Sequence, residues 1–230
     1  MDIKRLPIEE TMEDMKSKGK NIPFLVLVLL IVLSFLAGCG AKTGETVPSA
    51  TAKESQKKSL VVYFSRTGEQ YAVGNIDKGN TAIVAEMIAQ ETGADLFELV
   101  PEEDHYPTDS YSALTEICQK ERSSGARPAY KGTVPDLKQY DTIYIGSPVW
   151  WGDFPMIVYT FLENNDLSGK KLVPFNTNEG SGLSGFDTDL RDTCPNSTVL
   201  KGLAITGSDA QNTPDQVQQS VRDWLADLPL

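Results

Sequence analysis

The sequence predicts an α/β fold, a doubly wound parallel sheet of five strands in residues 59–230. Two observations predict it. Short apolar runs rich in β-branched and aromatic residues recur from residue 59 onward, as in strands buried on both faces. Segments with helical spacing of apolar residues lie between them, and strands alternating with helices form a parallel sheet covered on both faces. The 230 residues, 40% of them hydrophobic, suffice for one domain with a proper core.

The first elements are predicted from apolar runs and from the glycine and proline residues that end them. Residues 59–65, SLVVYFS, form a continuous apolar run and predict the first strand. A helix begins at Asn80, carries apolar residues at helical spacing and stops at Gly93. The second strand, 95–100, ends at Pro101, and a polar stretch then leads to a helix at 112–121. This order already contains one strand–helix–strand unit.

The second half of the domain repeats the alternation. The remaining strands are predicted at 142–146, 171–175 and 198–205, with a helix at 154–163. The chain closes with a helix at 214–228, which Thr213 can cap and Pro214 can begin. Its apolar residues form one stripe, as expected for a helix that packs against a sheet.

The first 39 residues are predicted to be a signal and not part of the fold. Residues 22–38 are an apolar run without charge, preceded by three lysines and followed by Cys39, which is the layout of a secretory signal. Residues 36–39, Leu-Ala-Gly-Cys, resemble the lipobox of bacterial lipoproteins. That resemblance implies cleavage before Cys39 and a lipid on its sulfur, and hence an extracytoplasmic protein anchored to the cell membrane. An uncleaved transmembrane anchor is the alternative, although 17 residues is short for a span.

Two further features concern the N-terminal part. The acidic stretch before Met15 is unusual ahead of a signal, so translation starting at Met15 is an alternative to Met1. Residues 40–58 contain one Val and no other large apolar residue, and this composition predicts a flexible linker.

Charge and cysteine content exclude several classes of protein. A net charge of −11 argues against nucleic-acid binding, which needs clustered Lys and Arg. Three Cys without CxxC spacing and one His argue against a structural zinc site. Cys118 and Cys194 could pair in an oxidising compartment, but sequence alone cannot place them close enough. A lone loop histidine, His105, beside two acids, is more often incidental than functional.

Ligands of an open parallel sheet bind beyond the carboxyl ends of its strands, so the loops there are the candidate site. After the first strand come hydroxyl and glycine residues, an excursion at 69–79, and then the start of a helix; the residues are Ser65, Arg66, Thr67, Gly68, Asn80 and Thr81. Hydroxyls and free N–H groups at a helix N-terminus suit a phosphate. An ordinary turn capped by Asn80 or Thr81 is the alternative. Neither a GxxxxGK[ST] nor a GxGxxG motif is present.

Two more loops complete the candidate site. The loop after the third strand carries two of the three tryptophans: Pro148, Val149, Trp150, Trp151, Gly152 and Asp153. Adjacent Trp side chains cannot easily both point inward, which favours one lining a flat ligand. The loop after the fourth strand is rich in small residues whose amides could reach a ligand: Asn176, Thr177, Glu179, Gly180, Ser181 and Gly182.

Together these three loops resemble the flavin-contacting loops of the flavodoxin family, from residue 59 to the C-terminus. The resemblance implies a sheet ordered 2-1-3-4-5 with FMN at the switch point. It places the phosphate on Ser65, Thr67, Gly68, Asn80 and Thr81, the isoalloxazine against Trp150 or Trp151, and its pyrimidine edge on the backbone of Thr177, Glu179 and Gly180. It implies that the Gly152-Asp153 peptide turns over on reduction. Arg66 departs from the family's use of neutral groups, and its side chain is expected to point to solvent.

The resemblance implies electron transfer by a membrane-anchored, extracytoplasmic FMN protein. Its partners would be a redox protein or a small electron acceptor, with the membrane contacted through lipid. An FMN-dependent NAD(P)H:quinone-type oxidoreductase is one alternative, so whether the chain is an enzyme stays open. A binding module that kept the fold without a redox role is another.

Overall fold

The computed structural model describes residues 58–230. The predicted signal at 1–39, the lipidation at Cys39, the alternative starts and nearly all of the linker lie outside the described residues. Within residues 58–230, no helix is both long and apolar enough to cross a bilayer.

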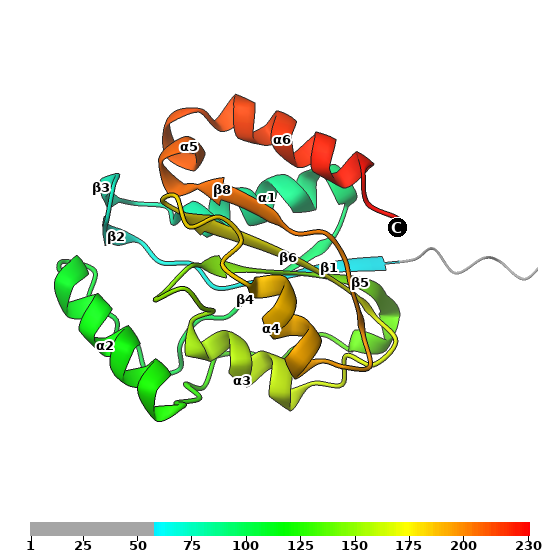
Figure 1. The fold of residues 1–230 in the computed structure, drawn as a ribbon, viewed down its shortest axis with the longest axis horizontal. Helices are drawn as coiled ribbons and strands as arrows, with labels where there is room; N and C mark the ends of the chain where they lie inside the picture. Colours follow the sequence, from blue (N-terminus) through cyan, green and yellow to red (C-terminus); the bar gives the residue numbers. More distant parts are fainter. Residues whose placement is uncertain (1–57) are drawn as a thin grey trace, which may run out of the picture. The chain divides into compact units, whose positions relative to one another are not determined.

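The centre of the domain is a parallel sheet with the predicted strand order (Figure 1). Its strands are β1 (Lys58–Tyr63), β4 (Asp95–Glu98), β5 (Tyr140–Pro148), β6 (Lys171–Asn178), β7 (Thr198–Val199) and β8 (Leu203–Thr206). The order is β4-β1-β5-β6-β7, with β8 also paired to β6. In order of the predicted strands this is 2-1-3-4-5, and the prediction is confirmed.

Helices cover both faces of the sheet, as the buried apolar strands require (Figure 1). One face packs on α1 (Asn80–Thr92), α5 (Gly207–Asn212) and α6 (Pro214–Ala226). The other packs on α2 (Tyr111–Ser124), α3 (Met156–Asn164) and α4 (Phe186–Thr193). In β1 the side chains alternate between them: Leu60 and Val62 join one cluster, Val61 and Tyr63 the other.

A hairpin, two short helices and a 3₁₀ turn were not predicted. The excursion after the first strand contains an antiparallel hairpin of β2 (Gly68–Gln70) and β3 (Gly74–Ile76). Helices α4 and α5 are also new; they have eight and six residues, too few to show a clear helical period in the sequence. A 3₁₀ turn, η1 (Leu137–Gln139), also precedes β5.

The predicted fifth strand, 198–205, is two short strands. β7 pairs with Lys171 and Leu172, whereas β8 pairs with the stretch from Phe175 to Asn178. Between Leu172 and Phe175 the partner segment holds one residue more than β6, so the ladder cannot continue unbroken. Pro174 lies in this interval of β6, where its missing N–H costs no ladder bond.

The two cysteines of the domain are free thiols. Cys118 lies in α2 and Cys194 follows α4, and both are buried in the core. The structure therefore shows that Cys118 and Cys194 do not form a disulfide.

Candidate functional site

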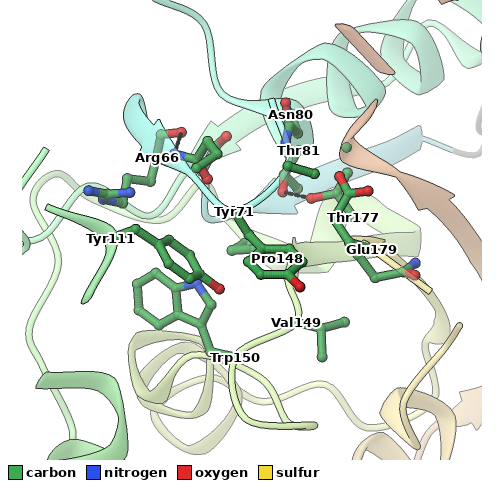
Figure 2. A pocket seen from close by; sticks show the side chains of 15 residues that line it. Arg66, Tyr71, Asn80, Thr81, Tyr111, Pro148, Val149, Trp150, Thr177 and Glu179 are labelled. Atoms are coloured by element: carbon green, nitrogen blue, oxygen red, sulfur yellow. Dashed lines mark hydrogen bonds between the residues drawn. The ribbon is translucent and has the colours of Figure 1, made fainter. Parts of the chain in front are cut away.

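The loops after β1, β5 and β6 meet at the carboxyl edge of the sheet and line one cavity (Figure 2). The lining residues are Ser65, Arg66, Gln70, Tyr71, Ala72, Asn80, Thr81, Tyr111, Pro148, Val149, Trp150, Thr177, Asn178, Glu179 and Gly207. Such an edge is where ligands of open parallel sheets bind. The cavity has a polar end at the start of α1 and an aromatic side formed by three rings.

The polar end is built on the first turn of α1. Its N-cap is Gly79, which has no side chain of its own to cap the helix, and its first turn holds no acidic residue. The Ser65 hydroxyl accepts a hydrogen bond from the N–H of Ala82 at 3.0 Å. The hydroxyls of Thr81 and Thr177 bond each other at 2.7 Å and join α1 to β6. A helix N-terminus without acids favours an anion.

Arg66 does not point to solvent, so that prediction is wrong. Its side chain is only 9% exposed and donates to the backbone carbonyls of Glu69, at 2.6 Å, and Pro107. Burial lowers its pKa from the ordinary value, while nearby acidic groups act in the opposite direction. Figure 2 shows the guanidinium directed away from Asn80 and Thr81. Arg66 therefore ties the β2–β3 hairpin to the loop before α2.

The hairpin brings in aromatic residues that the sequence reasoning missed. Tyr71, at its tip, is 74% exposed, and its ring lies 5.9 Å from that of Tyr111 at the start of α2. In Figure 2 the rings of Tyr71, Tyr111 and Trp150 border the same space. A pair of tyrosines some 40 residues apart carries no local signal, because only the hairpin brings them together.

Trp150 is the aromatic residue held most firmly. Its indole meets the rings of Phe64 and Tyr106 edge to face, each at 5.2 Å between centroids. Phe64 is fully buried and Tyr106 nearly so. Edge-to-face pairs add stabilisation beyond burial, about 0.5–1.5 kcal/mol each. The indole is thereby fixed in orientation at the wall of the cavity.

Trp151 and Gly152 form the central pair of a tight turn. The N–H of Asp153 donates to the Trp150 carbonyl at 3.1 Å, and the reverse bond is 3.0 Å. Both central residues have positive φ, 55° and 75°, as in a type I′ turn. Trp151 is 51% exposed and its Nε1 donates to the carbonyl of Thr115 in α2. This turn sends Trp150 toward the cavity and Trp151 away from it.

Both carboxylate oxygens of Asp153 accept hydrogen bonds within the fold. Its Oδ1 accepts from the N–H of Phe154 and the hydroxyl of Tyr159, both at 2.7 Å. Its Oδ2 accepts from Arg122 at 3.1 Å. Asp153 thus joins the turn to α3 and α2 and does not line the cavity.

The amides expected to reach a ligand after β6 are already bonded. Asn178 Oδ1 accepts from the N–H groups of Gly180, at 2.9 Å, and Gly182, at 3.2 Å. Buried Asn176 donates to the Gly182 carbonyl and accepts from the Asn178 side chain. Neither glycine lines the cavity, so the expectation of ligand contacts through the Gly180 amide is not met in this geometry.

Glu179 lines the cavity through an element that was not predicted. Its carboxylate accepts from the N–H of Ser208, at 2.8 Å, and from the Ser208 hydroxyl. Nearby, Gln211 donates to Asn80 Oδ1 at 2.7 Å. A Cβ at Gly207 would collide with the Asn80 side chain, so this close approach needs glycine. The start of α5 thus closes the cavity against α1.

His105 takes part in a cluster behind Trp150. Its Nε2 bonds Glu121 at 2.6 Å and its Nδ1 bonds the Glu103 carbonyl at 2.8 Å. The buried Tyr106 hydroxyl also donates to the Glu121 carboxylate. Burial first, and then Glu121, raise the pKa of Tyr106 above its ordinary range. The cluster holds the loop before α2 against the C-terminal part of that helix.

The structure divides the predicted residues into two groups. Those that line the cavity are Ser65, Arg66, Asn80, Thr81, Pro148, Val149, Trp150, Thr177 and Glu179. The others lie in the same loops but off the cavity: Thr67, Gly68, Trp151, Gly152, Asp153, Asn176, Gly180, Ser181 and Gly182. Residues that were missed are Gln70, Tyr71, Ala72, Tyr111, Asn178 and Gly207.

Comparisons with known proteins agree with this geometry. The family model described as Flavodoxin matches residues 58–225. No curated protein sequence is similar enough to count as a match. A protein described as a flavoprotein from Bacteroides uniformis has a similar structure, with 29% identity and a TM-score of 0.56, over 72% of this chain and 98% of its own.

Two further structures are similar. A protein described as a flavoprotein from Bacteroides eggerthii is 29% identical with a TM-score of 0.55, over 75% of this chain and 98% of its own. A flavoprotein from Lactobacillus acidophilus, solved in complex with FMN, is 26% identical with a TM-score of 0.51. That match covers 66% of this chain and 95% of the other.

Proposed function

The chain belongs to the flavodoxin family, and from this premise we propose that it binds FMN in the cavity at the carboxyl edge of the sheet and transfers electrons. One observation carries the proposal. A helix N-terminus without acids, with glycine as its N-cap, and a wall of aromatic rings line the same cavity. The Lactobacillus acidophilus neighbour, solved with FMN, supports the choice of cofactor.

The polar end fits a phosphate. The first turn of α1 offers backbone N–H groups, and the hydroxyls of Ser65 and Thr81 lie beside it. Asn80 adds a side-chain amide. Arg66 holds the hairpin in place and acts on the phosphate only through that positioning.

The aromatic side fits a flat ring. Trp150 has a fixed orientation because the rings of Phe64 and Tyr106 both pack against its indole edge to face. Tyr71 is exposed on the hairpin, so its ring can cover a bound cofactor without repacking the core. Pro148 and Val149 add apolar surface that excludes water. Bound FMN supplies the exchange of one or two electrons, and the chain holds and shields it.

The test is binding of FMN by the purified chain. We expect stoichiometric FMN with quenched flavin fluorescence. Replacing Tyr71 with Ala (Tyr71→Ala) removes ring contact worth about 0.5–1.5 kcal/mol and so weakens FMN binding roughly two- to tenfold. Leu96→Ala, a change at another exposed apolar residue, on β4 away from the cavity, is the control and leaves the FMN dissociation constant unchanged.

Two outcomes contradict the proposal. If the chain does not bind FMN, the assignment of the cofactor is wrong. If Tyr71→Ala and Leu96→Ala weaken FMN binding equally, the assignment of the cavity as the FMN site is wrong. A separate assay distinguishes a carrier from an NAD(P)H:quinone-type oxidoreductase. Sustained NAD(P)H oxidation by the FMN-loaded protein in the presence of a quinone would favour the enzyme.

We also propose that the domain works outside the cytoplasm on a lipid anchor. The support is the sequence of residues 1–39, with the apolar run and lipobox-like residues that end at Cys39. The acidic domain would be repelled by anionic lipid, so attachment depends on the lipid at Cys39.

A further inference from the structure

A second cavity lies beside the first, between α2 and the loop after β5. It is lined by Tyr111, Leu114, Thr115, Cys118, Val149, Trp150 and Trp151. The four α2 residues have helical spacing and so share one face of that helix. Tyr111, Val149 and Trp150 line both cavities, whereas the other four line only the second.

The lining of the second cavity is mainly apolar and carries no charged side chain. None of the lining residues is acidic or basic, and Leu114 and Cys118 are buried. Burial, and then the charge of Glu121, raise the pKa of Cys118, so its thiol stays neutral. A charged ligand would lose its hydration here without a charged partner among the lining residues, so the lining favours a neutral one.

The cavity has a fixed rim. Trp151 stands at its edge, half exposed, and its Nε1 bonds the Thr115 carbonyl at 2.9 Å. The positive φ of Trp151 holds the indole in this place through the tight turn. The rim therefore joins the two walls, α2 and the loop after β5.

The size is that of an aromatic ring with substituents. The cavity has a volume of about 230 Å³. An apolar cavity of about 150 Å³ is enough to bind benzene. Neutral lining, ring-sized volume and two tryptophan walls together select a flat, uncharged molecule.

We infer that this second cavity binds a neutral, single-ring aromatic or quinone molecule, in contact with Trp150 and Trp151. Its position gives it a role that rests on the proposed function. An occupant there touches residues that also line the cavity proposed for FMN, so it would lie beside the flavin. A quinone in this place would take two electrons and two protons from reduced FMN and become a hydroquinone, while the FMN would return to its oxidised form. The binding itself does not depend on FMN.

The experiment uses duroquinone, a fully methylated benzoquinone that does not add thiols. Isothermal titration is carried out on the full chain, with and without FMN. We expect saturable binding in both states, and at least tenfold weaker binding of 2,4,6-trimethylbenzoate, which has similar size but is anionic.

Two matched variants on α2 locate the site. Cys118→Leu fills the cavity, and we expect at least tenfold weaker duroquinone binding with an unchanged FMN dissociation constant. Gln119→Leu adds the same side chain on the exposed side of the helix and leaves both constants unchanged. Should Cys118→Leu fail to fold, the comparison of duroquinone with trimethylbenzoate on the unaltered chain still decides.

Several outcomes overturn the inference. These are no saturable duroquinone binding, equal binding of the anion, or equal effects of the two leucine variants. Loss of duroquinone binding on loading with FMN would show that the cavity is part of the cofactor site. Failure of FMN to bind, with duroquinone still bound, would instead overturn the proposed function alone.

Discussion

Glycines at positive φ set the shape of the loops around the cavity, and two of them differ in a measurable way. Gly68 has φ of 83° and Gly152 has φ of 75°. A Cβ at Gly68 would collide with the carbonyl group of Thr108, whereas a Cβ at Gly152 meets nothing within 4 Å. The two positions therefore share the backbone strain but not the steric clash.

We expect Gly152→Ala to lower the free energy of unfolding by about 1–2 kcal/mol, the cost of an L-residue in the left-handed region. Gly68→Ala has that cost plus about 1–3 kcal/mol for the overpacked Cβ. Urea unfolding of both variants checks this, and Gly152→Ala serves as the control. Equal losses, or a larger loss at Gly152, would contradict the steric account.

At the residue scale the sequence predicts the site in part. Ser65 and Trp150 come just after β1 and β5, and Thr177 lies at the carboxyl end of β6, so the rule that ligands bind at carboxyl ends finds them. The side chain of Arg66 was misplaced because the carbonyls that accept its bonds come from segments that only the fold brings together. The Gly180 amide looked free because the Asn178 bond depends on the exact turn.

At the scale of elements, long periodic segments were predicted and short irregular ones were not. Apolar runs predict the buried strands, and helical spacing of apolar residues predicts the helices α1, α2, α3 and α6. The hairpin has three-residue strands, and α5 has only six residues, so neither shows a period. Tyr71 and Gly207 were missed with them, because those elements carry them to the cavity.

The loop before α2 depends on the protonation of His105. The partners of both ring nitrogens, a carboxylate and a carbonyl, only accept hydrogen bonds, so the doubly protonated ring fits best. Burial alone would lower the pKa of His105, but the bonds to Glu121 and Glu103 outweigh it and raise the pKa above 6.5. This contribution to stability is complete below the unfolded pKa and is lost as pH rises through the folded one.

We therefore expect His105→Gln to reduce the free energy of unfolding at pH 6. The reduction should become smaller as the pH rises past the raised pKa of His105. Urea unfolding from pH 5.5 to 9 measures the difference. The chain has one histidine, so its imidazole NMR signals report the pKa directly. A difference that stays constant over this range would contradict the charged pair.

Helix α4 carries an acid that works against folding at neutral pH. Burial first, and then the charges of Asp153, Asp192 and Asp187, raise the pKa of Asp189 to about 6. A carboxyl with a raised folded pKa destabilises the fold above that pKa, and the penalty disappears below the unfolded value of 3.8. Its ionised form is the unfavourable one.

We expect Asp189→Asn to raise the free energy of unfolding at pH 7 to 8, with the gain shrinking as pH falls through 6 toward 4. Chemical unfolding at several pH values measures it. Asp187→Asn is the comparison, because Asp187 pairs with Arg191 at 2.8 Å on the surface. Stabilisation of Asp189→Asn that persists at pH 4 would rule out this origin.

At the scale of the whole molecule, the proposed attachment to the membrane depends on one residue, Cys39. We expect a chain expressed in a bacterium to incorporate labelled fatty acid, and Cys39→Ala to abolish the label. Cys118→Ser is the control, because Cys118 is a buried thiol of the folded domain. Label retained in Cys39→Ala, or no label in the unaltered chain, would contradict the lipoprotein proposal, and the second outcome would favour an uncleaved anchor.

The net charge of −11 belongs to the whole molecule as well. An acidic protein attracts basic partners over a distance of about one Debye length, which is near 8 Å at physiological salt. We therefore expect the rate of electron transfer to a basic redox protein to fall steeply with added salt. The rate with a neutral acceptor such as duroquinone should change little.

The pairing of β6 with two separate short strands, β7 and β8, affects how this edge of the sheet opens locally. β7 and β8 hold β6 through two short ladders separated at Pro174. Each ladder can break without the other, so their amide protons should exchange with solvent as two groups with separate opening energies. The β8 group lies next to Thr177 and the start of α5, so a ligand in the cavity should slow its exchange selectively. The exchange rate of the β7 amides would then be an internal reference, and the ratio of the β8 rate to the β7 rate would report whether the cavity is occupied.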